Sequence, residues 1–425
     1  MRSRRPSSSP ARQRGAAAFV VTALLVFAML IVVTVANRNA IVETRASANQ
    51  YRSTQSFEAA EAGLEWALAR LNDDAPMGDD CLPSGDPAAP SFRERYLRDA
   101  GAGFVAATWS DAGPPRPLQA ACVRGEGGWS CHCPANGFAA VDEPAGSATA
   151  PGFTLQFIDG ARPGIVRAIA TGCTRRGAPC SGAATEGHEA AARVEVGLAL
   201  VSALRAAPVA ALTAGGNVDA GASALGVFNT DAASGGIALH TGGAIAGNAL
   251  RLGVPAGSPL DGALVPGDPQ LAALAGDRFF ARWFGMDRAA WRAQSAVAPL
   301  ACSGDCAAAI GAAVAAGTRL VAVDGDVAVT GPLELGTAER PIVLVVPGAL
   351  RLRGGVAVHG VVVAGSLEWR DAAANTGAIV RGAALVEGSY QGDADADFVR
   401  DAALLARLQR QTGSYARVNG SWKDF

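Results

Sequence analysis

Apolar residues fill the chain from position 16 to position 36, and only Thr22 and Thr34 interrupt them. Such a run has the length of about 20 residues that a helix needs to cross the hydrocarbon core of a bilayer. Apolar residues then continue at helical spacing to Leu71, past charged residues such as Arg38. The pattern therefore predicts one long helix, with a first half at 16–37 in lipid and a second half packed on a soluble domain.

Short strand-like runs follow the predicted helix. Residues 72–207 mix loops rich in Pro, Gly and Asp with runs such as FTLQFI, GIVRAIATGC and ARVEVGLALV. The last two runs predict a pair of antiparallel strands separated by a cysteine-bearing loop. We therefore expect an α/β domain at residues 38–207.

A different pattern characterises residues 208–425. Around 209–255 and again from 318 to 390, β-branched runs of strand length alternate with Gly or Asn, as in PIVLVVPGALRLRGG and VAVHGVVVAGSLEW. Loosely repeated strands of this kind predict a β-solenoid, in which each coil buries its apolar face on the next. A β-sandwich or barrel produces much the same pattern. The predicted fold class is α+β, with a solenoid favoured over a sandwich for the Gly-rich region.

A helical segment interrupts the Gly-rich region at about residues 269–316. Such a segment either packs against the solenoid or presents a binding face, and packing is the simpler interpretation. A short amphipathic helix is expected from Phe398 to Thr412, ahead of an extended tail that ends in GSWKDF. The aromatic residues at helical spacing in the first segment are Phe279, Phe280, Trp283, Phe284 and Trp291.

Composition narrows the classes of function. Half of the 425 residues are hydrophobic and 17% are charged, yet only 6% are aromatic, whereas Gly occurs 52 times. Apolar surface made mainly of Ala, Val and Leu favours closely approaching backbones over a core of large rings. The formal net charge is −2, and no run of Lys or Arg occurs outside the N-terminus. Because a polyanion needs a basic surface, we expect no nucleic-acid partner.

The N-terminal leader, residues 1–15, is basic and contains no acidic residue. Positive charge beside a membrane helix stays on the cytoplasmic side, so the bulk of the chain is expected on the opposite side. A signal peptide has a shorter apolar region that ends in a small-x-small cleavage site before a change of composition, whereas here the helical pattern continues beyond the apolar run. The basic residues of the leader are Arg2, Arg4, Arg5, Arg12 and Arg14.

All eight cysteines lie on the exported side of the apolar helix, where an even number indicates disulfides. Cys173 and Cys180 flank the polar sequence TRRGAP, so a loop disulfide between them is expected. Cys302 and Cys306 pair if the CSGDC turn brings their backbones within disulfide reach.

The other four cysteines have no readable pairing. Cys131 and Cys133 flank His132, a sequence that also suggests a metal site. Zinc-binding pairs of cysteines normally keep two or more residues between them, so disulfides are the favoured interpretation. Which of Cys81 and Cys122 joins which partner stays open.

The junction RQRG, directly before the apolar helix, resembles the leader junction of type IV pilins and pseudopilins, which a prepilin peptidase cuts after the Gly. By this resemblance the cut falls between Gly15 and Ala16. The stretch QSFEAAEAGLEWALARL, residues 55–71, is similar to the helix end of PilX-type minor pilins, and the closing GSWKDF is similar to the end of large PilX-type proteins. The resemblance covers about residues 11–72, is weak at the C-terminus and is absent in between.

Val20 departs from the pattern of the major pilins. Major pilins usually carry Glu as the fifth residue of the mature chain, where its carboxylate pairs with the N-terminal amine of a neighbouring subunit. An acidic side chain in hydrocarbon is costly without such a partner. PilX-type pilins and the K-type pseudopilin of type II secretion also lack this Glu, so Val20 implies a place at or near the filament tip.

The resemblance implies a minor pilin-like structural subunit that helps to prime or cap type IV pilus assembly, with an exposed C-terminal domain available for adhesion. The implied partners are other minor pilins, the pilus assembly machinery, prepilin peptidase and the inner membrane. The bulk of the chain would lie in the periplasm and later at the pilus tip on the cell surface. The residues implied for the membrane and assembly helix are Phe19, Val20, Leu24, Leu25, Phe27, Leu30, Phe57, Glu61 and Leu64.

Two other classes of protein stay open. A K-type pseudopilin also lacks the acidic residue, but its large domain is mostly helical, whereas this chain is rich in predicted strands. A single-pass envelope protein with a ligand-binding solenoid would share the anchor, but prepilin peptidase would not cut it after Gly15.

The sequence contains no signature of an enzyme. A Gly-x-Ser-x-Gly elbow, a phosphate loop and an HExxH motif are all absent. The four histidines have no evident partners in sequence, so we expect a protein without a catalytic site. They are His132, His188, His240 and His359.

Asp393, Asp395 and Asp397 alternate in the sequence GDADADF. An extended chain points all three carboxylates to one side, where they could hold calcium through oxygen ligands. The segment lacks the Gly and the distal Glu of an EF-hand loop, and a solvated acidic turn is the other interpretation. Calcium is thus the one candidate cofactor.

Overall fold

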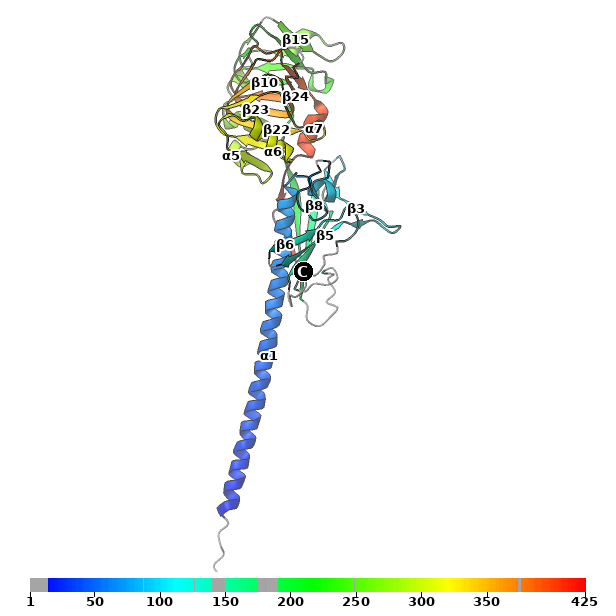
Figure 1. The fold of residues 1–425 in the computed structure, drawn as a ribbon, viewed down its shortest axis with the longest axis vertical. Coiled ribbons are helices and arrows are strands. Elements are labelled where there is room, and N and C mark those ends of the chain that lie inside the picture. Colours follow the sequence, from blue (N-terminus) through cyan, green and yellow to red (C-terminus); the bar gives the residue numbers. More distant parts are fainter. Residues whose placement is uncertain are drawn as a thin grey trace, which may run out of the picture.

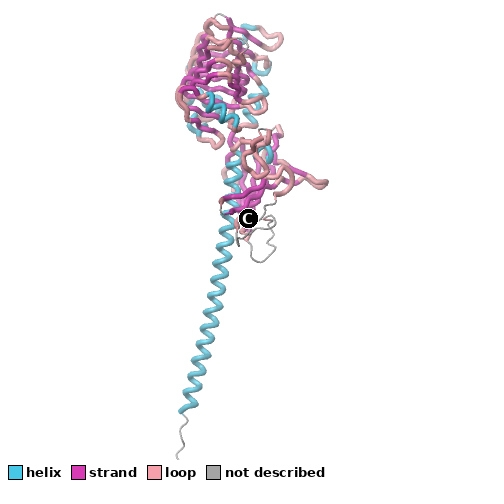
Figure 2. Tube along the Cα trace, viewed as in Figure 1, coloured by secondary structure: helices cyan, strands magenta, loops and turns pink. Residues whose placement is uncertain are grey.

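The computed structural model describes residues 14–425 apart from 87, 102, 126, 140–149, 175–179, 181–189, 248 and 374–375. Figures 1 and 2 show a long helix, a sheet packed beside its far end, and a larger stack of strands beyond that end. Most of the predicted leader and His188 lie outside the described residues.

Helix α1 (Arg14–Leu71) is one unbroken rod of 58 residues. Its most apolar stretch has a mean hydropathy of 2.9, and none of that stretch is buried. Further along, Ser56 and Leu64 are buried against the sheet. The structure therefore confirms the predicted continuous helix, whose first half is long and apolar enough to cross a bilayer and whose second half is packed.

An antiparallel sheet packs against the second half of α1. Its strand order is β27-β9-β8-β7-β5-β6, and β28 also pairs with β9. The predicted antiparallel pair is confirmed, since Val166 of β8 lies opposite Leu198 of β9. The strands are β5 (Gln119–Gly125), β6 (Gly128–His132), β7 (Gly152–Asp159), β8 (Ile165–Cys173), β9 (Ala191–Ser202), β27 (Gly413–Arg417) and β28 (Lys423–Asp424).

Small residues let α1 and the sheet approach closely. Ala60 and Ala67 are fully buried. A Cβ placed on Gly172 of β8 would lie 2.0 Å from the carbonyl oxygen of Ser56. Because any side chain there would collide with backbone, only glycine fits. The Ala-rich sequence of α1 around residues 59–67 therefore has a packing role.

Aromatic rings fill the core between α1 and the sheet. Phe153 and Phe157 of β7 are buried together with Phe92 and Tyr96, whose ring centroids lie 4.6 Å apart. The last two belong to α2 (Phe92–Tyr96), which begins with a capping box. The remaining strands of this region are β1 (Leu97–Asp99), β2 (Phe104–Ala106), β3 (Thr108–Trp109) and β4 (Arg116–Pro117).

Seventeen strands of the described chain form a second sheet. Their pairs are parallel, and residues at matching positions of successive coils lie side by side, as Val218 does with Ile245 and with Tyr390. Parallel stacking of coils is the arrangement of a β-solenoid and excludes a sandwich of antiparallel sheets. The strands are β10 (Leu212–Ala214), β11 (Val218–Asp219), β12 (Ala224–Phe228), β13 (Leu239–Thr241), β14 (Ile245–Ala246), β15 (Ala249–Gly253), β16 (Leu264–Val265), β17 (Val297–Leu300), β18 (Gly304–Asp305), β19 (Leu320–Val323), β20 (Val327–Thr330), β21 (Leu333–Leu335), β22 (Ile342–Arg353), β23 (Val356–Arg370), β24 (Ile379–Val386), β25 (Tyr390–Gly392) and β26 (Asp397–Arg400).

The coils do not stack in the order of the sequence. β10 pairs with β13 on one side and with β24 on the other. A column of glycines at one corner repeats this order: the N–H of Gly388 donates to the oxygen of Gly365 (2.7 Å), Gly216 to Gly388 (2.7 Å) and Gly243 to Gly216 (3.0 Å). The chain thus forms the distal coils first and then returns to form the coils nearest the antiparallel sheet (Figure 1).

Short helices carry the chain back along the outer wall of the solenoid. Phe280 and Phe284 stack with ring centroids 4.1 Å apart, and both pack with Trp291 on outward-facing residues such as Val343. This confirms the packing interpretation of the aromatic face. The helices are α3 (Pro269–Ala272), α4 (Asp277–Phe284) and α5 (Arg288–Arg292).

The helical segment predicted at 269–316 is broken by strands. β17 and β18 pair in parallel with β19 and β20 and so form the first proximal coil, after which α6 (Ala307–Ala315) follows. The helix predicted from Phe398 begins later, as α7 (Ala402–Arg410), because Asp397–Arg400 pairs with β24 as strand β26.

The end of the chain departs from the domain predicted at 208–425. After α7 the chain leaves the solenoid, and β27 pairs with β9, with Gly413 opposite Ser202. The solenoid is thus inserted between two neighbouring strands of the antiparallel sheet. Sequence patterns did not indicate this pairing because the whole solenoid separates its two strands.

Candidate functional site

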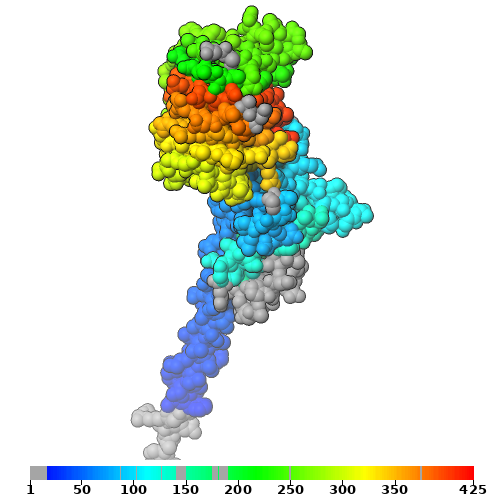
Figure 3. All heavy atoms as spheres, turned by 45° about the horizontal axis from the view of Figure 1, so that its top comes forward, coloured from blue at the N-terminus to red at the C-terminus, as the bar shows by residue number. Residues whose placement is uncertain are grey.

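The apolar half of α1 is the most exposed hydrophobic surface of the described chain. Its predicted membrane and assembly residues are 55–74% exposed and are distributed around the whole helix. A helix that is apolar on every side is stable in lipid or between other helices, not in water. Figure 3 shows this half of α1 projecting away from the rest of the molecule. The residues are Phe19, Val20, Leu24, Leu25, Phe27 and Leu30.

The two threonines in this half are satisfied within the helix. The Thr22 hydroxyl donates to the carbonyl oxygen of Ala18 at 3.0 Å, and the Thr34 hydroxyl donates to that of Leu30. Such bonds let a hydroxyl enter hydrocarbon without an unpaired donor. Gly15 and Ala16, the predicted cleavage junction, lie in the first turn of α1.

The packed half of α1 holds the last residues of the chain. Of the three residues predicted there, Leu64 is buried in the core. Phe57 meets the ring of Trp422 edge to face, with centroids 6.3 Å apart. Glu61 accepts a hydrogen bond of 2.7 Å from Nε1 of Trp422. The two stretches that carry the family resemblance, residues 55–71 and the closing GSWKDF, are therefore in direct contact.

We name residues 411–425 the C-terminal strap. Two further contacts fix it along α1. Arg417 of the strap forms an ion pair of 2.7 Å with Glu65. The amide of Asn72, next to the last residue of α1, accepts from the N–H of Tyr415 (2.6 Å) and donates to its carbonyl oxygen (3.1 Å). Sequence reasoning missed these partners because more than 300 residues separate them.

Arg93 ties the strap to the end of α1. Its guanidinium is 2% exposed and donates to the carbonyl oxygens of Leu71 (2.9 Å), Gly413 (3.0 Å) and Gln411 (3.3 Å). It also forms an ion pair of 3.4 Å with Asp74. A buried guanidinium is tolerated because its donors and its charge are satisfied in this way.

The ring of Tyr415 lies beneath Arg93, with 5.2 Å between the guanidinium carbon and the ring centroid. Burial raises the pKa of the Tyr415 hydroxyl above its usual range, so this ring is neutral at any physiological pH. A cation over a neutral, desolvated ring is favourable. The strap is therefore held at its upper end, beside Leu71, by hydrogen bonds and by this cation–π contact.

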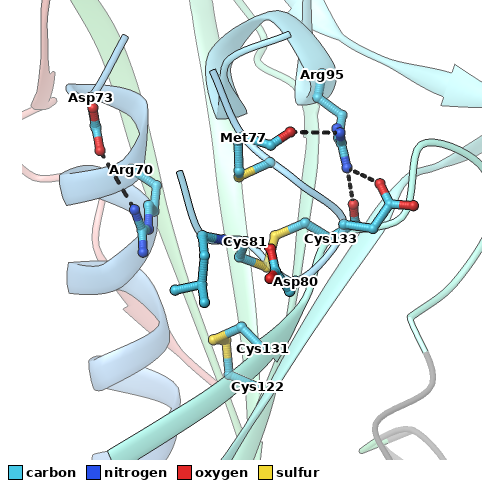
Figure 4. The surroundings of a disulfide bond; sticks show 11 residues. Arg70, Asp73, Met77, Asp80, Cys81, Arg95, Cys122, Cys131 and Cys133 are labelled. Atoms are coloured by element: carbon cyan, nitrogen blue, oxygen red, sulfur yellow. Dashed lines mark hydrogen bonds and ion pairs between the residues drawn. A yellow bond between two sulfur atoms is a disulfide. The ribbon is translucent and has the colours of Figure 1, made fainter. Parts of the chain in front are cut away.

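All eight cysteines are paired. The expected Cys173–Cys180 and Cys302–Cys306 disulfides are present, which confirms the pairing inferred from spacing. The two pairings that stayed open are Cys81–Cys133 and Cys122–Cys131 (Figure 4). Because the cysteines that flank His132 belong to two different disulfides, the metal interpretation of Cys-His-Cys is wrong.

Arg95 fixes the loop around the first of these disulfides. Its guanidinium forms an ion pair of 2.6 Å with Asp79. It also donates to the carbonyl oxygens of Cys133 and Met77 (Figure 4). The disulfides therefore belong to a packed structural loop, not to a reactive site.

The predicted calcium ligands have separate partners. Asp393 contacts Arg370 at 3.3 Å, and Asp395 accepts from the N–H of Ala224 at 2.8 Å. Asp397 forms an ion pair of 2.7 Å with Arg251, across Gly226, where a side chain would collide with the Asp397 carboxylate. Within the described ranges no three acidic, His or Cys side chains are grouped as metal ligands. The row faces outward as expected, but it links coils and is not a ligand set.

Two histidines have carboxylate partners that the sequence did not indicate. His240 Nε2 lies 2.8 Å from Asp268, and His359 lies 3.6 Å from Glu334. Burial acts to raise the pKa of Asp268, but hydrogen bonds from His240 and from the N–H groups of Gln270 and Leu271 lower it overall. This pair joins β13 to the start of α3.

Comparison with known proteins concerns mainly the N-terminal segment. Residues 14–65 match the PilX N-terminal family, which confirms the resemblance over α1 and leaves the sheet and the solenoid unassigned. No curated protein matches the chain. The crystal structure of the competence-associated pilin ComZ from Thermus thermophilus is similar over 88% of this chain and 98% of that chain, at 11% identity and a TM-score of 0.21. A similarity at that score carries no argument about fold or function.

Proposed function

We propose that the protein is a structural subunit that helps to prime or cap a type IV pilus, because residues 14–65 match the PilX N-terminal family. In this proposal prepilin peptidase cuts between Gly15 and Ala16. The mature chain is then held in the inner membrane by α1, with its bulk in the periplasm, and later lies at the pilus tip with its solenoid available for adhesion. Other minor pilins and the assembly machinery are its partners.

The exposed half of α1 supports assembly with other helices. It is apolar on every side, and no described part of the chain covers it. In lipid it is stable alone, and on leaving lipid it needs equally apolar neighbours. A head-to-tail arrangement of such helices generates an open helical filament.

The position of the solenoid is the observation that carries the tip assignment. Figure 1 places the solenoid beyond the far end of α1, roughly in line with the helix. A further subunit stacked on that end would meet the solenoid, which would block growth of the filament in that direction. Val20 agrees with this place, because a subunit without a neighbour above it has no amine to pair with an acidic residue.

The distal end of the solenoid suits a surface-exposed position. β15 and β16 lie at this end. The loop between them contains Pro255 and Pro259, and Pro266 directly follows β16. Proline lacks the N–H that another strand would bind, so it protects a sheet edge from aggregation. The end can therefore be exposed without pairing at random.

The first experiment is mass spectrometry of the N-terminal residue of the membrane-purified protein. It compares the wild type with Gly15→Val in cells that do and do not have prepilin peptidase. A mature start at Ala16 that disappears in both controls supports the pilin pathway. An uncut N-terminus in every sample means a plain single-pass anchor and overturns the proposal.

Counting pili on cells that lack the protein then separates the remaining classes. Fewer pili, restored by the wild-type gene, support priming or capping. Normal pili with a loss of type II secretion favour a K-type pseudopilin, although the parallel solenoid differs from the mostly helical domain expected of that class.

A further inference from the structure

The backbone crosses from the antiparallel sheet to the solenoid twice, and the two crossings are adjacent. β9 ends at Ser202 opposite Gly413, where β27 begins, and the N–H of Ala203 donates to the carbonyl oxygen of Thr412 at 2.8 Å. Each of the disulfides lies wholly on one side of this junction. The second crossing leads into the strap, which ends at Phe425 and is held by non-covalent contacts alone.

We propose that the C-terminal strap is a non-covalent lock that carries tension from the solenoid to α1. The strap runs from Gln411, beside the end of α1, to Trp422, beside Phe57, and so lies antiparallel to the packed half of the helix. A pull on the solenoid draws the strap along this half of α1. All contacts between strap and helix are then loaded together instead of one after another.

The upper contacts give the lock most of its strength. Arg93 and Asn72 are both buried, and together they engage the backbone of the strap at Gln411, Gly413 and Tyr415. These bonds form where water is excluded, and breaking the lock separates several of them together, which costs more than losing one exposed contact.

The contacts nearer the end of the strap, which we call the lower contacts, orient the strap more than they strengthen the lock. The ion pair of Arg417 with Glu65 is partly exposed, at 35% and 65%, and exposed pairs are weak. Lys423 and Asp424 pair with Glu195 and Val194 of β9. These contacts keep the strap aligned with the axis of α1. A force on the solenoid therefore acts along the length of the strap.

A second route exists through β9 and β8. Nine residue pairs hold these strands together, and β8 packs on α1 through Gly172. The direct ion pair across the junction, between Arg340 and Glu94 at 2.8 Å, is partly exposed on both sides. The solenoid also packs on the segment after α1, where a Cβ on Gly317 would lie 2.8 Å from the Cα of Ala75. The strap is the route that runs along the packed half of α1 itself.

The biological sense of the lock rests on the proposed function, in which the solenoid is exposed and can be pulled. Its test does not, because it uses purified full-length protein in lipid nanodiscs without any pilus. A failure of pilus assembly and a failure of the lock are therefore distinguishable.

The test inserts a protease site between Ala206 and Ala207, which are both partly exposed. No disulfide crosses the cut, so the part from residue 207 onward stays attached only through the strap and the junction contacts. We expect the two parts to co-elute after cleavage. Separation on cleavage in the wild-type background would overturn the proposal.

Asn72→Leu removes both amide bonds to Tyr415 with little change in volume. We expect the dissociation constant of the cut parts to rise at least about tenfold, which corresponds to about 1.4 kcal/mol. Asn229→Leu is the matched control, because Asn229 is likewise a buried asparagine that binds backbone, but inside the solenoid. An equal rise in both variants would mean a general loss of stability and would count against the lock.

A second variant keeps the test informative if Asn72→Leu does not fold. Trp422→Ala with Arg417→Gln loosens the exposed part of the strap, and we expect a rise of about threefold in the dissociation constant, within the range of exposed contacts. The matched control is Trp129→Ala with Arg351→Gln, whose side chains are similarly exposed and lie away from the strap. No difference between this pair of variants would overturn the role of the lower contacts.

Tension itself is measured with optical tweezers. One handle is attached through Ser258→Cys in the exposed distal loop, which is possible because every native cysteine is paired, and the other to the N-terminus. We expect the first rupture force to fall in Asn72→Leu and to stay unchanged in Asn229→Leu. An unchanged force in Asn72→Leu would mean that β9 carries the load, and the proposal would be wrong.

Discussion

The antiparallel sheet and the solenoid bury their apolar residues by different means. The sheet encloses its core only because α1, from the start of the chain, covers one face and the strap, from its end, adds the edge strands β27 and β28. The solenoid encloses its core by stacking each coil on a neighbour. The residues of this core all come from the part of the chain between Ala211, directly before β10, and α7. The first region depends on both ends of the chain, and the second depends on neither.

The two cores differ in chemistry as well. Rings and disulfides fill the core of the sheet region, as Phe92, Phe153 and Phe157 with Cys122 and Cys133 illustrate. The interior of the solenoid consists mostly of Val, Leu and Ala, with few rings. Stacked coils approach at the spacing of neighbouring strands, so small and β-branched residues fill the interior. A helix on a sheet leaves a deeper space that larger side chains fill.

One chain thus contains two kinds of region. In the sheet region, residues far apart in the sequence are in contact, and in the solenoid each coil contacts its neighbouring coils. Repeated coils contact only their neighbours, so they are expected to tolerate damage elsewhere. The sheet region, in contrast, is stable only when both α1 and the strap are packed on it. Substitutions in one region should therefore leave the other region largely unchanged.

Deletion of residues 413–425 is expected to destabilise the sheet region by about 5 kcal/mol or more, the size of a whole domain's stability. It removes five residue pairs of β27 with β9 and uncovers Arg93. Hydrogen exchange measured by mass spectrometry should show lost protection in β7 to β9 and unchanged protection in β22 to β24. Equal loss in both regions would contradict the independence of the solenoid.

Replacing Cys81 and Cys133 by Ser is expected to cost about 4 kcal/mol, because their sequence separation of 52 closes a long loop in the unfolded chain. The same change at Cys302 and Cys306, with a separation of 4, is expected to cost about 2 kcal/mol. Denaturant unfolding followed by region-resolved exchange measures both. A larger effect at Cys302 and Cys306 would reverse the comparison.

Leu225→Ala in the solenoid interior is expected to cost about 3 kcal/mol, because this fully buried side chain leaves a cavity between coils. Its effect should be confined to the solenoid. Leu260→Ala is the control, since Leu260 is 54% exposed and its loss should change stability little. Destabilisation of β7 to β9 by Leu225→Ala would show that the two regions unfold together.

Asp231→Asn is expected to have the smallest effect, about 1 kcal/mol at neutral pH. The N–H of Ala233 and the guanidinium of Arg400 lower the pKa of Asp231 below its ordinary value of 3.8. A lowered carboxyl pKa stabilises the fold above about pH 4, and this contribution is lost as the pH falls through the folded-state pKa. The difference between wild type and variant should therefore be present at pH 6 and shrink as the pH falls through the folded-state pKa. A difference that persists in acid would contradict this assignment.

The local features of the fold were predictable. The continuity of α1 follows from apolar residues at helical spacing, and the antiparallel pair of β8 and β9 follows from two β-branched runs around a polar loop. The short-range disulfides Cys173–Cys180 and Cys302–Cys306 follow from spacing. Each of these features depends on residues close together in the sequence, where periodicity and chain stiffness limit the alternatives.

Part of the candidate site was predictable for the same reason. Phe57, Glu61 and Leu64 could be singled out from the resemblance of α1 to PilX-type minor pilins, but their partners could not. Nothing local to Trp422 indicates that it contacts Phe57, and nothing local to Arg93 indicates that it binds the carbonyl oxygens of Leu71 and Gly413. The row of Asp393, Asp395 and Asp397 was predicted to face one way, yet its partners come from other coils.

The order of the elements in space could not be predicted. β10 stacks on β24, and β27 lies beside β9, although long stretches of chain separate them. The entropy of closing a long loop changes little with its length, so sequence distance does not decide between such pairings. The local sequence pattern determines whether a segment forms a helix or a strand. Which segments pair in space depends on the burial and hydrogen bonding of the whole chain.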